Sequence, residues 1–380
     1  MDLLDFLFNS LLGTIVPFLF VLTVVVFFHE LGHFWVARRC GVKIDAFSVG
    51  FGRELFGRND KYGTRWKVCW IPLGGYVKFS GDENAASMPS REEIASMDEE
   101  TRRTAFFAKS VWQRMAIVAA GPIANFILAI VIFAGLFFFL GKMETVPRVD
   151  AVRPDSAAQV AGFEPGDIIL RINDSEIESF ADLQRIVTAS ANQELRIDVD
   201  REGVLVHLKA TPKRQELTDP FGNTQKVGVL GIEHRGRSGD VKVRSYGALE
   251  ALGAGAQETW FIIARTGGYI AGLFHGTEDT SQLGGPIKIA EVSGQVAAHG
   301  IIPLVNLIAV LSVSIGLLNL LPVPVLDGGH LLFYVIEAVR GKPLNERVQD
   351  IGFRIGISLV LLLMIFTTWN DLRTKIIEWL

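Results

Sequence analysis

The sequence has very few cysteines. Only Cys40 and Cys69 occur among 380 residues, and their separation is too wide for a Cys-x-x-Cys redox or metal pair. Two cysteines are also too few for a disulfide framework, so both are expected to be free thiols.

The sequence also lacks any concentration of positive charge. Its 37 Lys and Arg residues are outnumbered by 41 Asp and Glu residues, which gives a net charge of −4. The two signs are interspersed, whereas a protein that binds nucleic acid needs a basic patch or stripe. We therefore expect no nucleic-acid partner.

Charge is nearly absent from four long stretches. They are residues 11–37, 115–140, 301–326 and 351–370. Each can cross a hydrocarbon layer of about 30 Å as a helix, with Arg354 reaching the interface from the fourth. No basic residue precedes the first stretch and no small-residue cleavage site follows it, so it is expected to be a retained span and not a signal peptide. The pattern predicts an α-helical membrane protein with four transmembrane helices that contact the lipid bilayer.

The distribution of basic residues predicts the orientation of these helices. Short loops rich in Lys and Arg stay in the cytoplasm, and such residues follow the first span and separate the third from the fourth. With four spans, residues 141–300 then lie outside the cytoplasm. The apolar stretch 255–274 could make a fifth span, but Glu258 and Arg265 would share one face of that helix, so we expect it to lie in the interface.

The segment between the second and third spans predicts an inserted α+β domain. Residues 168–172 follow a Pro-Gly-Asp turn and suit a strand, residues 195–200 alternate as a half-buried strand does, and Ser179 can cap a helix that ends near Ala189. The run from Val160 to Asn173 resembles the PDZ domains attached to bacterial proteases. The resemblance covers residues 147–212 and implies a PDZ-like domain, followed by a connector over residues 213–300.

A shorter aromatic segment lies between the first two spans. Residues 64–79 place Trp, Tyr and Val residues around Pro72, Gly74 and Gly75. Together with neighbouring Lys and Arg residues, this composition predicts a membrane-associated β-hairpin.

The end of the first span carries the strongest chemical motif. His29-Glu30-Leu31-Gly32-His33 fits H-E-x-x-H, in which two histidines four residues apart share one helix face and can bind one metal ion. Glu30 can then act as the general base and general acid of a hydrolysis. Polar residues at the end of an apolar span are costly and are functional by default.

A third metal ligand is expected from the end of the third span. Asp327 follows Pro322 and Pro324, which interrupt the helix and free backbone groups. Asn319 could hold a substrate backbone or satisfy the broken helix. His330 is a possible ligand, although a supporting or interface position fits it better.

These motifs together resemble the site-2 protease family of intramembrane zinc metalloproteases. The resemblance rests on His29-Glu30-Leu31-Gly32-His33, on Asn319 and on Leu326-Asp327-Gly328. The inserted domain, Gly121-Pro122-Ile123-Ala124-Asn125-Phe126 and the Gly-Gly-Pro-Ile sequence at 284–287 indicate the bacterial RseP-like branch. The resemblance implies that His29, His33 and Asp327 bind Zn²⁺, that Glu30 is the catalytic acid/base and that Asn319 binds substrate.

The resemblance also implies a substrate class and a location. Family members cleave transmembrane segments of single-span proteins, often anti-sigma factors already cut by an upstream site-1 protease, and some clear remnant signal peptides. We expect a multi-pass protein of the bacterial inner membrane, with a periplasmic PDZ-like domain and a site near the cytoplasmic side. Enterobacterial RseP-like proteins carry two PDZ domains, whereas this chain has room for one.

The sequence leaves two alternative functions open. An intramembrane metal transporter could use the same ligands but would not need Glu30, and a noncatalytic PDZ scaffold would leave the intramembrane carboxylates unexplained.

Gly121 and Ala124 are expected to let helices approach closely. Asn125 and Pro122 could line the site, but helix packing is the preferred interpretation.

Overall fold

The computed structural model describes residues 12–80, 99–218, 224–234, 241–275, 280 and 284–379. The chain forms two compact units. Unit 1 comprises Met1–Ala134, Leu252–Ile270 and Leu283–Leu380, and unit 2 comprises Gly135–Ala251 and Ala271–Gln282.

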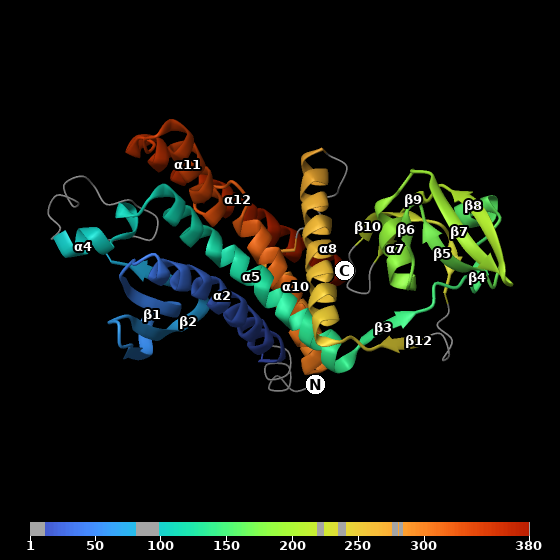
Figure 1. Cartoon of the computed structure of the whole chain (residues 1–380), viewed down its shortest axis with the longest axis horizontal. Coiled ribbons are helices and arrows are strands. Elements are labelled where there is room, and N and C mark those ends of the chain that lie inside the picture. The colour runs from blue at the N-terminus through green and yellow to red at the C-terminus, as the bar shows by residue number, and fades with distance from the viewer. Residues whose placement is uncertain are drawn as a thin grey trace. The chain divides into compact units, whose positions relative to one another are not determined.

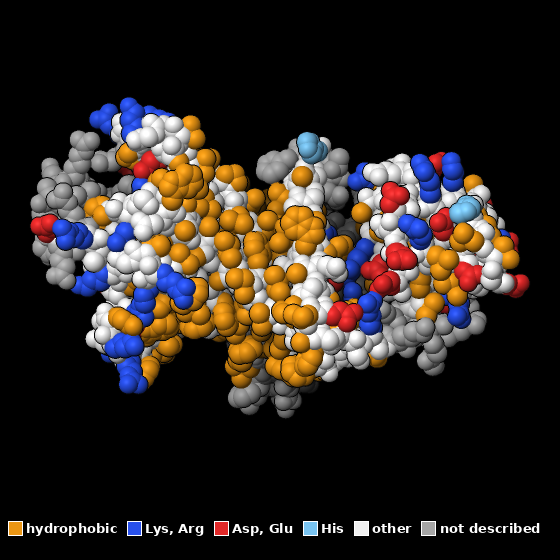
Figure 2. Space-filling model, viewed as in Figure 1, with side chains coloured by type: hydrophobic (Ala, Val, Ile, Leu, Met, Phe, Trp, Pro, Cys, Tyr) orange, Lys and Arg blue, Asp and Glu red, His pale blue; other side chains and the backbone are white. Residues whose placement is uncertain are grey.

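Four helices of the described residues are long and apolar enough to cross a membrane, as the sequence predicts. They are α2 (Gly13–Arg39), α5 (Val111–Leu140), α10 (Ile301–Asn319) and α12 (Glu346–Trp379) (Figure 1). Figure 2 shows hydrophobic side chains over the helices of unit 1 on the face drawn, with few charged groups among them. Helices that are apolar on all sides suit a lipid environment.

Three of these helices share a core. Val21 and Val25 of α2, Leu128 of α5, and Leu304 and Ile308 of α10 form one buried cluster. Since lipid chains are as apolar as leucine, such helices associate through close packing and not through the hydrophobic effect.

A glycine permits the closest approach of α2 to α5. A Cβ on Gly32 would lie 2.2 Å from the Ala120 carbonyl oxygen and 2.7 Å from Cβ of Ala124. The expected role of Ala124 in close helix packing is therefore confirmed, with Gly32 as its partner.

The third predicted span is shorter than expected. Helix α10 ends at Asn319, and a new helix, α11, begins at Asp327 and ends at Arg340. Pro322 and Pro324 cannot continue a helix, and Val325 has a φ of 101°, which is rare for a β-branched residue. The predicted interruption before Asp327 is confirmed.

Two further long helices and two short ones lie wholly or mostly in the described part of unit 1. Helix α8 (Ala248–Phe274) starts earlier than the predicted 255–274, and α9 (Pro286–Ala298) was not predicted. The Asp371 carboxylate of α12 accepts hydrogen bonds from the backbone N–H groups of Gly285 and Lys288, and so caps α9 from a remote helix. The short helices are α4 (Glu99–Thr104) and η2 (Phe106–Ala108).

The predicted hairpin within residues 64–79 is corrected by the structure. One strand, β2 (Arg65–Phe79), covers this stretch, and its partner is β1 (Ile44–Asn59). Phe47 of β1 pairs with both Val77 and Trp66, so the first half of β1 lies between the two halves of β2. The glycines of β1 hide its strand pattern in the sequence, and those of β2 allow the bend that resembled a turn.

Unit 2 is a small α+β unit. Its central sheet has the strand order β6-β5-β7-β8, formed by Ser175–Glu176, Ile168–Ile172, Leu195–Arg201 and Val204–Ala210. Helices α6 (Ala157–Ala161) and α7 (Phe180–Ala189) pack on its core. Ser179 and Asp182 form a capping box at the start of α7, which confirms the predicted helix start.

Strands beyond residue 212 belong to the same unit. They are β9 (Lys213–Thr218), β10 (Thr224–Val229), β11 (Ile232–Glu233) and β12 (Val241–Arg244), which pair with one another or with β3 (Lys142–Thr145) and β4 (Ala151–Val152). The connector after residue 212 therefore contributes strands to unit 2, where the sequence indicated no strands.

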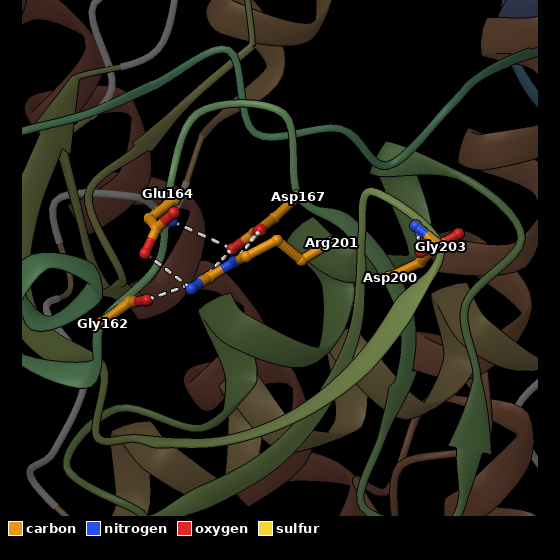
Figure 3. Close-up of polar contacts among 6 residues, drawn as sticks. All are labelled: Gly162, Glu164, Asp167, Asp200, Arg201 and Gly203. Atoms are coloured by element: carbon orange, nitrogen blue, oxygen red, sulfur yellow. Dashed lines mark hydrogen bonds and ion pairs between the residues drawn. The ribbon is translucent and has the colours of Figure 1, made fainter.

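A buried ion pair joins the end of β7 to the loop before β5 (Figure 3). The Arg201 guanidinium donates to both oxygens of Asp167 at 2.7 and 2.8 Å, and also to Glu164 and to the Gly162 carbonyl. The Asp167 side chain is 0% exposed. Arginine is suited to such a two-pronged contact.

Replacing Arg201 by leucine is expected to destabilise unit 2 by roughly 3 kcal/mol, because it leaves a buried carboxylate without its cation. Hydrogen exchange of the full-length protein should then be about a hundredfold faster in β5 and β7. Arg196→Leu, which changes an exposed arginine of the same strand, is the control. Equal exchange in both variants would show that the ion pair is not needed for stability.

Candidate metal centre

Helix α2 brings both histidines of the H-E-x-x-H motif to one side. Residues four apart in a helix lie one above the other, and Nε2 of His29 lies 3.2 Å from Nε2 of His33. His29 is 8% exposed, although it lies in an apolar helix. A buried polar ring in such a place needs partners on both nitrogens.

Asp327, at the start of α11, meets the two rings. Its Oδ2 atom lies 3.1 Å from His29 Nε2 and 3.5 Å from His33 Nε2. The same buried oxygen receives no hydrogen bond of good geometry from the described residues. Two segments almost three hundred residues apart in the chain therefore place three candidate ligand atoms around one point.

These three groups suit a zinc ion. Imidazole nitrogens and a carboxylate oxygen are typical zinc ligands, and bonds of about 2.0–2.1 Å at tetrahedral angles separate neighbouring ligand atoms by about 3.3 Å. The observed separations of 3.1 to 3.5 Å match that spacing. Three protein ligands leave a fourth position for water or substrate, as in catalytic zinc sites.

Residues of helix α5 contact both histidines. The Ile117 carbonyl oxygen lies 2.9 Å from His33 Nδ1 and accepts its hydrogen, so that Nε2 is left to bind a metal. One turn further, Gly121 leaves room for both rings. A Cβ at Gly121 would lie 2.3 Å from His33 Nε2 and 2.9 Å from His29 Cε1.

Strand β2 passes directly over Glu30. The Val77 backbone N–H lies beside the Glu30 carboxylate. A Cβ on Gly75 would lie 3.2 Å from Glu30 Cγ, so the glycine lets the strand approach closely. The backbone of β2 thus orients Glu30 beside the candidate ligands.

A cavity of about 420 Å³ opens beside these residues. Its wall combines residues of α2, β1, β2, η2, α5, α10, α11 and α12. The polar residues among them include His29, Glu30, His33, Asn319, Asp327, His330, Glu337 and Gln349. Apolar residues such as Phe79, Phe106 and Phe353 form much of the remainder. A largely apolar cavity with few convergent polar groups is typical of a substrate site.

An ion pair joins the turn between β1 and β2 to the C-terminal end of α2. Arg38 donates to Asp60 at 2.5 Å. Burial alone would raise the pKa of Asp60, but hydrogen bonds from Arg38, Trp66 and two backbone N–H groups lower the pKa from 3.8 to about 2. The stabilisation by this ionised carboxylate is therefore complete above about pH 4, and is lost as the pH falls through 2.

The structure brings together five residues that the sequence singled out. His29, His33 and Asp327 form one group, Glu30 lies beside it, and Asn319 lines the same cavity. His330 also lines this cavity but lies outside the group of candidate ligands, with its ring against Phe353. The roles of these residues stay predictions.

The sequence did not predict that residues of α5 contact the two histidines. Asn125 was assigned to helix packing, but its amide nitrogen lies 3.2 Å from His29 Nδ1. The spacing of Ile117, Gly121 and Asn125 by four residues could have indicated this shared face. An apolar helix, however, gives no sign of which face meets the histidines.

Comparison with known proteins shows similarity to one family of peptidases and to proteins named as metalloproteases. The model of Peptidase family M50 matches residues 17–363. A protein of Rhizobium meliloti with the name "Putative zinc metalloprotease" is 50% identical over 370 residues, which cover 97% of this chain and 99% of the relative. "Metalloprotease MmpA" of Caulobacter vibrioides is 43% identical over 381 residues, covering 94% of this chain and 95% of the relative.

Replacing Gly121 by alanine is expected to weaken metal binding at least tenfold, because the added methyl group would push both imidazoles from their positions. Equilibrium dialysis of the purified protein against zinc measures this effect. Gly135→Ala is a matched control in the same helix, since a Cβ there meets nothing within 4 Å. Equal zinc affinity in the two variants would contradict the geometry described for Gly121.

Proposed function

The chain belongs to Peptidase family M50, and we propose from this that it is a zinc metalloprotease that cleaves peptide bonds inside or beside the lipid bilayer. In this proposal His29, His33 and Asp327 hold the zinc ion and Glu30 is the catalytic acid/base. The observation that carries the proposal is the convergence of those three ligand atoms beside Glu30 within a bundle of apolar helices.

Zinc bound by these residues would polarise the scissile carbonyl and lower the pKa of a water molecule. Glu30 accepts the proton that this water loses on attack and returns it to the leaving amine. The Val77 N–H and the close approach at Gly75 hold the Glu30 carboxylate in one place during both transfers.

The substrate is proposed to bind as an extended strand along residues 75–79 of β2. These residues pair with β1 on one side, and no other strand of the described chain pairs with them. Gly75, Tyr76 and Val77 also line the cavity. An edge strand can accept an added peptide strand through backbone hydrogen bonds, and Asn319, which lines the same cavity, can hold the same peptide.

Single-span membrane proteins are the proposed substrates, among them anti-sigma-factor-like proteins and remnant signal peptides. A transmembrane helix shields its carbonyl groups by internal hydrogen bonds and must unwind before it can add to β2. We place the protein in the bacterial inner membrane, with unit 2 as a periplasmic PDZ-like domain that selects substrates already shortened by an upstream protease.

Glu30→Gln should abolish cleavage of a single-span substrate in detergent or liposomes, by a factor of at least a thousand, since the amide cannot accept the proton. Bound zinc should stay at the wild-type level. The wild-type protein, with zinc measured by atomic emission, is the reference. Undiminished cleavage by Glu30→Gln would exclude the assigned role, and zinc transport that survives this change would favour a transporter.

Proline at Lys78 tests the proposed substrate strand. Lys78 is an exposed residue that pairs with Ala46, and proline there removes a ladder hydrogen bond and distorts the strand beside the cavity. We expect cleavage to fall at least a hundredfold while bound zinc is retained.

The matched control is Arg58→Pro, at an exposed residue near the opposite edge of the same sheet. It should keep most of the activity, because this edge does not line the cavity. Equal loss in both variants would indicate that general stability of the sheet, and not its cavity edge, is what cleavage needs.

A further inference from the structure

One face of α5 contacts both candidate zinc-binding histidines. Ile117, Gly121 and Asn125 follow at intervals of four residues, so they lie along one side of the helix. Ile117 contacts His33 through its carbonyl oxygen, Gly121 gives both rings space, and Asn125 reaches His29. The inference concerns Asn125, whose side chain meets the nitrogen of His29 that faces away from Asp327.

The hydrogen bond at Nδ1 of His33 indicates which hydrogen bond His29 would need in order to bind a cation. A carbonyl oxygen only accepts hydrogen bonds, so Ile117 fixes the hydrogen of His33 on Nδ1 and leaves a lone pair on Nε2. Nε2 of His29 also faces Asp327, at 3.1 Å. For this atom to bind a cation, the hydrogen of a neutral His29 must be on Nδ1, and Nδ1 then needs an acceptor.

Asn125 can supply that acceptor. Its amide lies 3.2 Å from His29 Nδ1, and a half-turn of the amide exchanges the positions of its nitrogen and oxygen. The side chain is 0% exposed, and its oxygen has no hydrogen-bond partner in the orientation with the nitrogen toward His29. When Nδ1 of His29 carries the hydrogen, an amide nitrogen facing it would place donor against donor, so the orientation that turns the oxygen toward the ring is favoured.

The backbone and packing around Asn125 keep it in place. Ser312 of α10 donates a hydrogen bond of 2.8 Å to the Asn125 carbonyl oxygen. A Cβ on Gly316, one turn further along α10, would lie 3.2 Å from Asn125 Cβ. Helix α10 therefore packs directly against Asn125 and restricts its position.

We propose that Asn125 is a positioning residue of the metal centre, which accepts the Nδ1 hydrogen of His29 and so directs Nε2 toward the ion that His33 and Asp327 share. The inference rests on the proposed function. It assigns to Asn125 a chemical role in place of the packing role that its position in an apolar helix suggests.

The test uses the full-length protein in detergent and measures zinc affinity by competition with a chelator of known affinity. Asn125→Leu keeps the approximate size but removes the acceptor, and should weaken zinc binding about 10- to 100-fold. Asn125→Asp keeps an acceptor for the Nδ1 hydrogen and should retain zinc within a few fold. Asn306→Leu changes an exposed asparagine of α10 and is the control.

The Asn125→Asp variant distinguishes a positioning role of Asn125 from a packing role. If Asn125 only packed helices, a buried carboxylate would disturb the site at least as much as leucine does. Loss of zinc from both variants, or wild-type zinc affinity in Asn125→Leu, would overturn the inference.

A kinetic measurement adds a second criterion. Asn125→Leu saturated with zinc should show a reduced kcat with little change in KM, because Asn125 does not line the cavity. A change in KM alone would contradict the inference. If the wild type itself neither binds zinc nor cleaves, the proposed function fails; if it does both and Asn125→Leu is indistinguishable from it, only the role of Asn125 fails.

Discussion

The arrangement of unit 1 depends on one constraint: polar ligand groups must be completely satisfied in a bundle of apolar helices. An unpaired imidazole or carboxylate is costly where no water can solvate it. The structure places His29, His33 and Asp327 within reach of one another, so that one bound cation would complete the contacts of all three groups. The outer nitrogens of both rings then turn to α5, where a carbonyl oxygen and an amide receive them.

Close helix contact makes this arrangement possible. Gly32 lets α2 approach α5 one residue before His33, and Gly121 removes the side chain that would occupy the space of the rings. The approach of α11 has a different cause. The prolines after α10 end one helix, so a second begins at Asp327 and presents its carboxylate at depth in the bundle. Glycine and proline therefore determine where the candidate ligands meet, although neither contributes a candidate ligand atom.

The sequence predicted the features that are local in the chain. Uncharged runs defined the four apolar helices, the four-residue spacing placed His29 and His33 on one face, and Pro322 and Pro324 indicated the interruption before Asp327. Contacts that depend on the rotation of a helix were not predictable, because α5 is apolar on all sides. Strand β1 was missed since its pairing with β2 is irregular, and α9 is capped by Asp371, over eighty residues away.

The combination of a helix-borne site and a sheet edge suits the cleavage of a membrane-spanning helix. Such a substrate loses its internal hydrogen bonds when it unwinds, and this loss is severe in lipid unless other backbone groups replace them. Residues 75–79 of β2 offer replacements within the same cavity that holds Glu30. Because Val77 of the same strand lies beside Glu30, one strand would position both the unwound peptide and the proposed acid/base. Unwinding and proton transfer would then share a single structural element.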